Sequence, residues 1–335
     1  MHTSFSLVAL TLLASTTIAQ DAFEPFEGGM NEGAWSFRVT TPDVIETSGG
    51  NPGGWLHNSQ IDSFAPMCVN TASSSCFTGD FRAKGVTSIE VDAITNTTNF
   101  PVMGFEFSLL LRDTKGTSNV NDDDYAYFVG PEIPLPGAGW KSFSFNVPSA
   151  STAATPAGWS GGWVGDCCGF RPGVDWNDVI TNVDQIEFWW LNPSFFAIFQ
   201  QWNVGVDNIR LTSAATTTSR NGTGVNPNAL TATNTPVIGQ TWSASVDLAA
   251  TGAGSSYLAI SKQSIPGTVL SGVVTGELLI LPPFLFEQGS LTGLHDAPVP
   301  LDCSFTGASF SAQAVAISPG NFQLTNAIDF TIGNL

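Results

Sequence analysis

Three acidic residues in the first two-thirds of the chain are the strongest candidates for chemistry. Asp207 lies in the segment Val204–Leu211, where apolar and polar residues alternate as in a half-buried strand. A carboxylate among hydrophobic residues is costly unless it is paired, hydrogen-bonded or bound to a cation. Glu24 and Glu27 lie near the start of the chain, and pairing of the first strand with the last would bring one of them to Asp207. Calcium prefers such oxygen ligands, so we predict a structural calcium ion held by these carboxylates. The alternative is that Asp207 caps a turn or pairs with Arg210, while the glutamates are solvated.

Tryptophan residues form the second group with recognisable chemistry. Flat aromatic rings stack on the apolar faces of sugar rings, while nearby polar side chains hydrogen-bond the hydroxyl groups. Trp159 and Trp163 lie in a glycine-rich run, and Trp55 follows two glycines in another loop-like segment. We therefore predict that Trp55, Trp159 and Trp163 form a sugar-binding surface. Other tryptophans lie in strand-like patterns and are expected in the core: Trp35, Trp140, Trp189 and Trp202.

Catalytic patterns are incomplete. Glu90 and Asp92 alternate along a strand-like segment as the carboxylates of jelly-roll glycoside hydrolases do, but Ile94 stands where a second glutamate is required. His57 and His295 are the histidines available to a serine triad, and neither lies near a nucleophile elbow. The sequence therefore predicts a protein that is not an enzyme.

Charge and composition restrict the partners and the cellular location. The chain of 335 residues has 28 Asp and Glu against 10 Lys and Arg, a formal net charge of −18, which disfavours nucleic acid and anionic membranes as partners. Residues 1–19 contain a short apolar run and a small-residue cleavage site, which are typical of a signal peptide and too short to span a bilayer. We expect a secreted protein, extracellular or at the cell surface, without membrane insertion.

Five cysteines in a secreted chain predict disulfide bonds. Cys68 and Cys76 flank a short polar loop that a disulfide could close. Cys167 and Cys168 are adjacent, so they form either a vicinal disulfide or separate bonds elsewhere. Cys303 has no evident partner nearby in the sequence.

A polar segment of small residues, 213–225, divides the chain and is typical of a linker. Residues 20–212 contain about eight strand-like runs separated by Pro, Gly and Asn clusters, and nine of the ten tryptophans. Residues 226–335 contain further short strand-like runs. The pattern predicts an all-β protein, with a jelly-roll sandwich followed by a smaller immunoglobulin-like β-sandwich.

A family resemblance supports this division. The runs Gly139–Ser149, Trp176–Ile186 and Val206–Leu211, with Trp159 between the first two, resemble laminin B (domain IV) and related jelly-roll carbohydrate-binding modules. The resemblance implies a galactose-binding-like jelly roll over residues 20–212, often with structural calcium, and extracellular adhesion or glycan contact. The whole chain resembles secreted bacterial proteins that carry a second all-β domain.

Together these features predict a secreted, non-catalytic protein that binds an extracellular polysaccharide or a matrix component and contains calcium. One alternative is a structural or adhesive surface protein that contacts other proteins through the apolar segment Phe195–Phe199. A glycan-active enzyme is the other alternative, and it would need two carboxylates facing each other across one groove.

Overall fold

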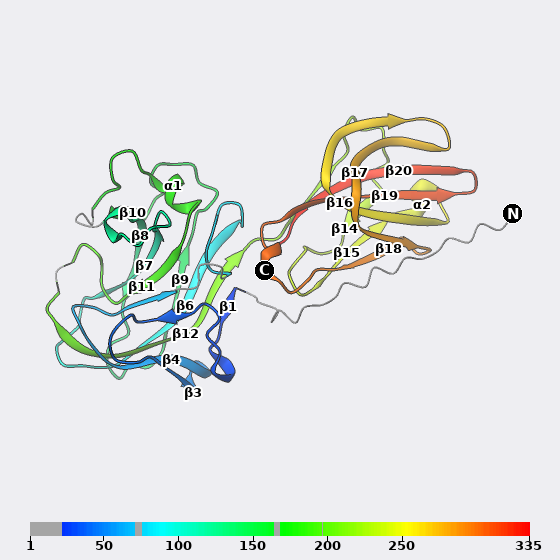
Figure 1. The fold of residues 1–335 in the computed structure, drawn as a ribbon. Helices are drawn as coiled ribbons and strands as arrows, with labels where there is room; N and C mark the ends of the chain where they lie inside the picture. The colour runs from blue at the N-terminus through cyan, green and yellow to red at the C-terminus, as the bar shows by residue number, and fades with distance from the viewer. Residues whose placement is uncertain (1–21, 71–75, 164–167, 196) are drawn as a thin grey trace.

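A computed structural model describes residues 22–70, 76–163, 168–195 and 197–335, which form two β-sandwich domains in sequence (Figure 1). The expectation of an all-β chain, with a jelly-roll sandwich followed by a smaller β-sandwich, is confirmed. The predicted signal peptide, residues 1–19, lies outside the described residues. Within the described ranges, no helix is long and apolar enough to cross a membrane.

The first domain consists of two six-stranded sheets within the described part of the chain. In sheet A the order is β3-β4-β12-β6-β9, and β1 also pairs with β12. In sheet B the order is β10-β8-β7-β11-β5-β2. Sheet A contains β1 (Phe23–Glu24), β3 (Val44–Gly50), β4 (Gly53–Ser63), β6 (Val86–Thr98), β9 (Lys141–Asn146) and β12 (Gln200–Ser213). Sheet B contains β2 (Trp35–Ser36), β5 (Met67–Asn70), β7 (Glu106–Asp113), β8 (Asp124–Glu132), β10 (Trp159–Trp163) and β11 (Gln185–Trp189).

The core of the first domain lies between the two sheets and follows the alternation of side chains along each strand. In β6, Ile89, Val91 and Ala93 are buried in this core, while Glu90 and Asp92 lie on the opposite face of the sheet. In sheet B the side chains also alternate between the core and the opposite face of the sheet. The helix α1 (Trp176–Ile180) begins with a capping box made by Asp175 and Asp178, and it places Trp176 in the core. Each sheet therefore keeps a second face, which points away from the core.

The second domain begins earlier than its composition predicts. Residues 216–220 of the predicted linker form a strand that pairs with β20, so only Ala214 and Ala215 separate the last strand of the first domain from the second. The five-stranded sheet has the order β13-β20-β17-β16-β19, and β14, β15 and β18 form a three-stranded sheet. Trp242 and Phe330 stack in the core between the sheets, 4.6 Å apart. The elements are β13 (Thr216–Arg220), β14 (Leu230–Ala232), β15 (Thr241–Val246), α2 (Leu248–Thr251), β16 (Ser255–Leu270), β17 (Val274–Ser290), β18 (Leu294–Pro298), β19 (Ser309–Ser318) and β20 (Asn321–Thr331).

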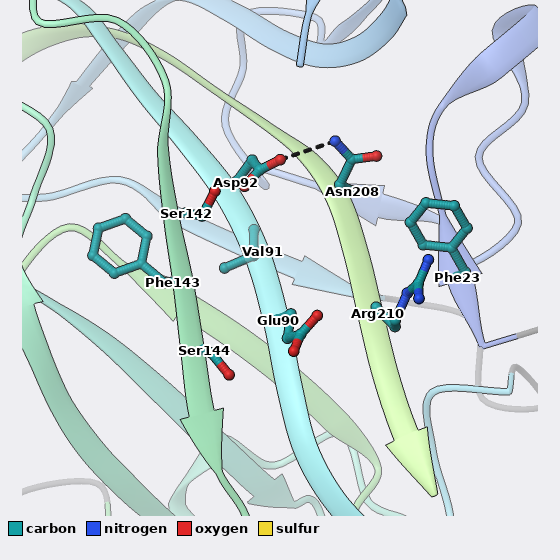
Figure 2. Close-up of a pocket in the computed structure, with 9 residues that line it drawn as sticks. All are labelled: Phe23, Glu90, Val91, Asp92, Ser142, Phe143, Ser144, Asn208 and Arg210. Carbon is teal, nitrogen blue, oxygen red and sulfur yellow. Dashed lines mark hydrogen bonds between the residues drawn. The ribbon is translucent and has the colours of Figure 1, made fainter. Parts of the chain in front are cut away.

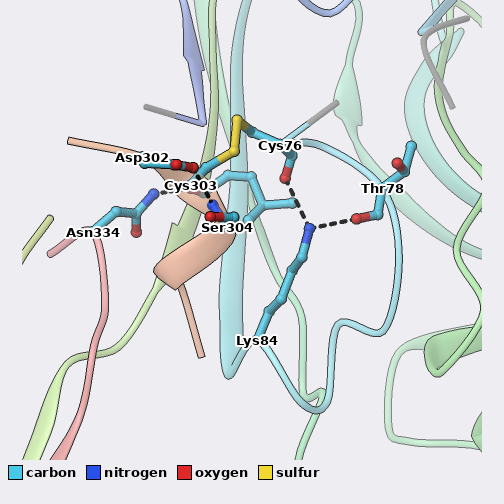
Figure 3. Close-up of a disulfide and its surroundings, with 8 residues drawn as sticks. Cys76, Thr78, Lys84, Asp302, Cys303, Ser304 and Asn334 are labelled. Carbon is cyan, nitrogen blue, oxygen red and sulfur yellow. Dashed lines mark hydrogen bonds between the residues drawn. A yellow bond between two sulfur atoms is a disulfide. The ribbon is translucent and has the colours of Figure 1, made fainter. Parts of the chain in front are cut away.

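A disulfide between Cys76 and Cys303 joins the two domains (Figure 3). The predicted pairing of Cys68 with Cys76 is wrong, because Cys68 is a buried free thiol on β5. Sequence spacing favoured the nearer cysteine, whereas the fold brings together cysteines separated by 227 residues. Cys168 takes part in a disulfide, but Cys167 lies outside the described residues, so its pairing stays a prediction.

Side-chain hydrogen bonds to the backbone and one close packing contact accompany this disulfide at the domain junction. The Asn334 side chain donates to Leu211 O at 2.6 Å and accepts from the Ser213 amide at 2.6 Å. Gly307 packs directly on the first domain, since a Cβ at this position would lie 2.3 Å from Ala83 O. Lys84 donates to the carbonyl groups of Cys76 and Thr78 beside the disulfide (Figure 3). The two domains therefore meet through a short connection, a covalent cross-link and specific hydrogen bonds.

Candidate functional site

Asp207 lies at a bulge in β12, where the pairing with β6 shifts in register between Asp207 and Arg210. The adjacent Asn208 has a φ of 49°, so the backbone turns sharply at this point. Asp207 is fully buried, and its two oxygens accept hydrogen bonds from the amides of Asn51, at 2.6 Å, and Asn208, at 2.7 Å. The bulge therefore places this carboxylate beneath the loop that joins β3 to β4.

Two further carboxylates lie close to Asp207. Asp92 is its direct partner on β6, and Glu27 approaches from the segment after β1. Burial, with added repulsion from Asp92 and Glu27, raises the pKa of Asp207 from 3.8 to about 6. Among the described residues, no lysine or arginine forms an ion pair with any of these three groups. Arg210 lies over the ring of Phe23 instead, 4.3 Å from its centroid. The cluster therefore carries negative charge that no protein cation balances.

The structure distinguishes the two glutamates of the first strand region. Glu27 accepts a hydrogen bond from the Gly54 amide at 3.2 Å, and a Cβ on Gly53 would lie 1.7 Å from its Oε1 atom. Glu24 is buried and accepts from the Gly33 amide at 2.9 Å, so it holds the loop that follows its own strand. Burial raises the pKa of Glu24 to about 7. Glu27, rather than Glu24, is therefore the glutamate that shares the glycine loop with Asp207.

The glycine loop also supplies carbonyl oxygens. The Cβ position on Gly50 lies 2.7 Å from Asp207 Oδ2, 2.9 Å from Gly53 O and 2.4 Å from Gly54 O. Oxygens from β12 and from the loop thus crowd around Gly50, where a side chain would not fit. Within the described residues no group of three His, Cys, Asp or Glu side chains is placed to hold a metal alone, so backbone carbonyls and water would have to complete the set. Carboxylates combined with carbonyls are the ligands that suit calcium.

A second candidate site lies on the face of sheet B that points away from the core. Strand register places three rows of side chains across it. Trp189 lies beside Ser108, Glu187 lies beside Leu110 and Tyr127, and Arg112 lies beside Tyr125. Leu110, Tyr125 and Tyr127 form a small apolar cluster, and Trp189 packs against it. This face is therefore both aromatic and charged, and Leu110, Tyr125, Tyr127 and Glu187 are buried in it while Trp189 is partly exposed.

An ion-pair network fixes the polar side chains of this face. Arg112 donates from Nε and Nη2 to the two carboxylate oxygens of Glu187, at 2.6 and 3.1 Å, and it also contacts Asp123 at 3.3 Å. The indole of Trp189 donates to Glu187 Oε2 at 2.8 Å. Burial lowers the pKa of Arg112, but the charges and hydrogen bonds of Glu187 and Asp123 together outweigh this effect and raise the pKa overall. The guanidinium group also lies over the ring of Tyr125, 5.4 Å from its centroid.

The same face contains an unpaired polar atom. The Ser108 hydroxyl lies next to Trp189 and has no hydrogen-bond partner among the described residues. Ser108 is fully buried, so its hydroxyl is closed to a ligand, and the missing partner costs free energy. What this face offers a ligand is the partly exposed ring of Trp189 beside the charged pair.

The three predicted tryptophans do not form one surface. Trp159 is buried in the core, 4.8 Å from the ring of Trp176. Trp163 is partly exposed at the end of β10, with the Arg171 guanidinium over its ring. Trp55 lies on sheet A, is 8% exposed, and stacks on His57 with the rings 4.4 Å apart. Trp159 was expected in an exposed loop, and this expectation is wrong because the glycine-rich run forms an edge strand.

Sequence reasoning missed Trp189 as a surface residue. In the segment 185–190, Gln, Glu and Trp alternate with Ile, Phe and Trp. This alternation places Trp189 on the face of Glu187 and Gln185, and Trp190 in the core. A tryptophan in a strand pattern can lie on either face, and the neighbours at two-residue spacing, Glu187 and Gln185, indicate the face of Trp189.

Comparisons with known proteins give limited similarity. No protein-family model and no curated protein matches the chain. A solved carbohydrate-binding module, CBM28, specific for non-crystalline cellulose, aligns with 57% of this chain and 94% of its own, at 15% identity and a TM-score of 0.28. A β-1,2-glucanase from Parabacteroides distasonis aligns with 90% of this chain at 11% identity and a TM-score of 0.27, and the chain spans 37% of its length. A triple jelly-roll protein of an archaeal virus aligns with 88% of this chain and 61% of its own, at 12% identity and a TM-score of 0.16. These similarities are too low to assign a ligand.

Proposed function

We propose that this protein is secreted and binds an extracellular polysaccharide on the outer face of sheet B. The observation that carries the proposal is Trp189, the partly exposed ring of this face, which packs against the buried cluster of Leu110, Tyr125 and Tyr127 beside the bidentate pair of Arg112 and Glu187. An aromatic ring on a rigid sheet supplies stacking surface at low entropic cost, because strand packing already fixes its rotamer. Arg112, whose side chain is 13% exposed, would supply donors to sugar hydroxyl groups.

The same network argues against catalysis at this face. A glycoside hydrolase needs one carboxyl group free to donate a proton and a second carboxylate free to attack or to activate water. Glu187 uses both of its oxygens for Arg112 and Trp189, and it is 3% exposed. The proposal is therefore a non-catalytic binding function.

Calcium is part of the proposal, with a structural role. Glu27 and Asp207, with the carbonyls of Gly53 and Gly54, are the groups that would hold it. The ion would supply positive charge to a carboxylate cluster and so tie the segment after β1 to the central strand β12.

Affinity electrophoresis of the mature protein through gels that contain different neutral polysaccharides tests the proposed face. We expect at least one polymer to retard the wild type, and Trp189→Ala to reduce its affinity about tenfold, as loss of a stacking contact does. Tyr257→Ala is the control, because Tyr257 is 38% exposed on β16 of the second domain. Thermal unfolding of each variant separates loss of binding from loss of fold. If no polymer retards the wild type, or if Trp189→Ala migrates as the control does, polysaccharide binding at this face is wrong.

A second function, protein adhesion, is favoured by one observation. Phe64, Phe195 and Phe199 are 57%, 53% and 59% exposed, and the rings of Phe64 and Phe199 are 5.7 Å apart. Exposed aromatic clusters of this kind mark protein contacts more often than free surface. Failure of all polysaccharides in the gel assay would favour this alternative.

A further inference from the structure

A series of depressions crosses the other side of the first domain and continues onto the second. The first depression, of about 390 Å³, lies on the outer face of sheet A. Glu90 and Asp92 of β6 and Ser144 of β9 form its floor, and Arg210 lies against Phe23 at its edge (Figure 2). Asp92 is fixed by the Asn208 side chain, which donates to it at 2.9 Å.

The next depression is larger, about 580 Å³, and both domains line it. Asn146 continues the outward side of β9 two residues beyond Ser144, so the two depressions are neighbours along this strand, although they share no lining residue. Its far side consists of Thr216, Ser309 and Thr331, which lie side by side on β13, β19 and β20. These three residues also line a third depression, of about 230 Å³, on the outer face of the second domain. The second and third depressions therefore adjoin each other, and the first is their neighbour along β9; the three together are called the groove below.

The domain junction described above fixes the two halves of this groove. Cys303, whose disulfide reaches Cys76, lies only a few residues before Ser309. Gly307, which packs on Ala83, lines the groove itself. A groove that crossed a flexible linker would lose its shape as the domains moved, whereas this one is cross-linked across its middle.

The lining of the groove indicates the class of ligand. Hydroxyl and amide groups recur along its whole length, and they match the hydroxyl groups of a sugar chain. Charge is balanced, although the whole chain carries a formal −18, so the groove favours neither a polycation nor a polyanion. Three acidic and three basic side chains line it: Glu90, Asp92, Asp329, Arg82, Arg210 and Lys262.

We propose that this groove is a second binding site, which holds an extended, neutral polysaccharide chain across both domains. It lies on sheet A and the second domain, on the opposite side of the sandwich from the aromatic face of sheet B. This second site rests on the proposed function only for the class of ligand, a polysaccharide. No residue of the groove belongs to the sheet B face.

Two bulky substitutions, one in each domain, test the groove. Ser144 and Thr216 are exposed strand residues, so Ser144→Tyr and Thr216→Tyr would block the groove while leaving the core unchanged. Thr241→Tyr is the matched control, since Thr241 is exposed on β15 and lies away from the groove. The measurement is affinity electrophoresis against a soluble neutral polysaccharide that retards the wild type, with a short oligosaccharide of the same sugar measured by calorimetry.

We expect each groove variant to bind the polymer about tenfold more weakly than the control and to bind the oligosaccharide at the sheet B face normally. Equal migration of Ser144→Tyr, Thr216→Tyr and Thr241→Tyr would overturn the groove. Trp189→Ala separates the two proposals, because it affects the sheet B face alone. If Trp189→Ala binds normally and the groove variants do not, the groove stands and the sheet B face fails.

Discussion

The effect of calcium on stability should depend on the charge of Asp207, and Asp207→Asn tests this directly. Asp207 has an ordinary pKa of 3.8 in the unfolded chain and about 6 in the fold. The folded state therefore binds the proton more tightly, so protonation stabilises the fold. That stabilisation is complete below pH 4 and is lost as the pH rises through about 6. The difference corresponds to about 3 kcal/mol, at about 1.4 kcal/mol for each pH unit.

The expected effect of Asp207→Asn on stability has opposite signs in chelator and in calcium. In a chelator at pH 7.5, Asp207→Asn removes the buried charge, which gains about 3 kcal/mol. It also turns an amide NH₂ toward one of the two backbone N–H donors, which costs about 1 to 2 kcal/mol. The variant should therefore unfold at a temperature equal to or above that of the wild type. In millimolar calcium the order should reverse, because the wild type gains an ion that needs the carboxylate and the variant does not.

Thermal unfolding followed by circular dichroism, in chelator and in calcium, measures both effects. Glu24→Gln is the control, because Glu24 is equally buried but turns toward Gly33. This variant should gain the same increment from calcium as the wild type. A second arm at pH 5 should show a smaller calcium effect, since Asp207 is then largely protonated. If calcium raises the unfolding temperature of Asp207→Asn as much as that of the wild type, the carboxylate cluster is not the calcium site.

Two further predictions concern the glycine loop and the domain junction. Gly53→Ala should weaken calcium binding about tenfold by titration calorimetry, because its Cβ would lie 1.7 Å from a carboxylate oxygen of the cluster. Gly137→Ala is a matched control, because Gly53 and Gly137 both have positive φ, 88° and 79°, but a Cβ on Gly137 would have no atom within 4 Å. Equal calcium affinities of the two variants would refute the assignment of the calcium site. Replacing both Cys76 and Cys303 with Ala should lower the free energy of unfolding by up to about 5 kcal/mol, the chain-entropy value for cysteines 227 residues apart. Urea unfolding checks this, and a loss below about 1 kcal/mol would mean that the unfolded chain gains little freedom without the cross-link.

Strand patterns predicted most of the first domain because alternation along a strand is a local property. The segment that contains Asp207 forms the long central strand β12, and Glu90 and Asp92 share one face of β6 as their spacing requires. Trp159 was placed wrongly because a glycine-rich run normally indicates a loop. In β10, Cβ atoms on Gly161 and Gly162 would lie 2.3 Å from the rings of Phe170 and Tyr125, so these glycines give space to aromatic neighbours.

Long-range contacts were the part that the sequence could not supply. The partner of Cys76 is determined by how two domains dock, and spacing along the chain contains no information about docking. The choice between Glu24 and Glu27 likewise depends on the turn after β1, where Phe26 has a φ of 55° and redirects the chain toward the glycine loop. The residue types thus predicted what chemistry was available, while backbone geometry decided which side chains meet.

The strand β12 connects the proposed calcium site to the domain junction. Asp207 and Ser213 are six residues apart on this strand, a distance of about 20 Å in extended backbone. The carboxylate cluster lies at the middle of the strand, and at its C-terminal end Ser213 bonds to Asn334 of the second domain. Only Ala214 and Ala215 then precede β13, so the second domain is an extension of this strand and not a separate body on a tether. A cation at Asp207 would stabilise the middle of β12, while the disulfide at Cys303 fixes the junction beyond its C-terminal end, so a ligand that spans both domains would meet a surface whose two halves are already in place.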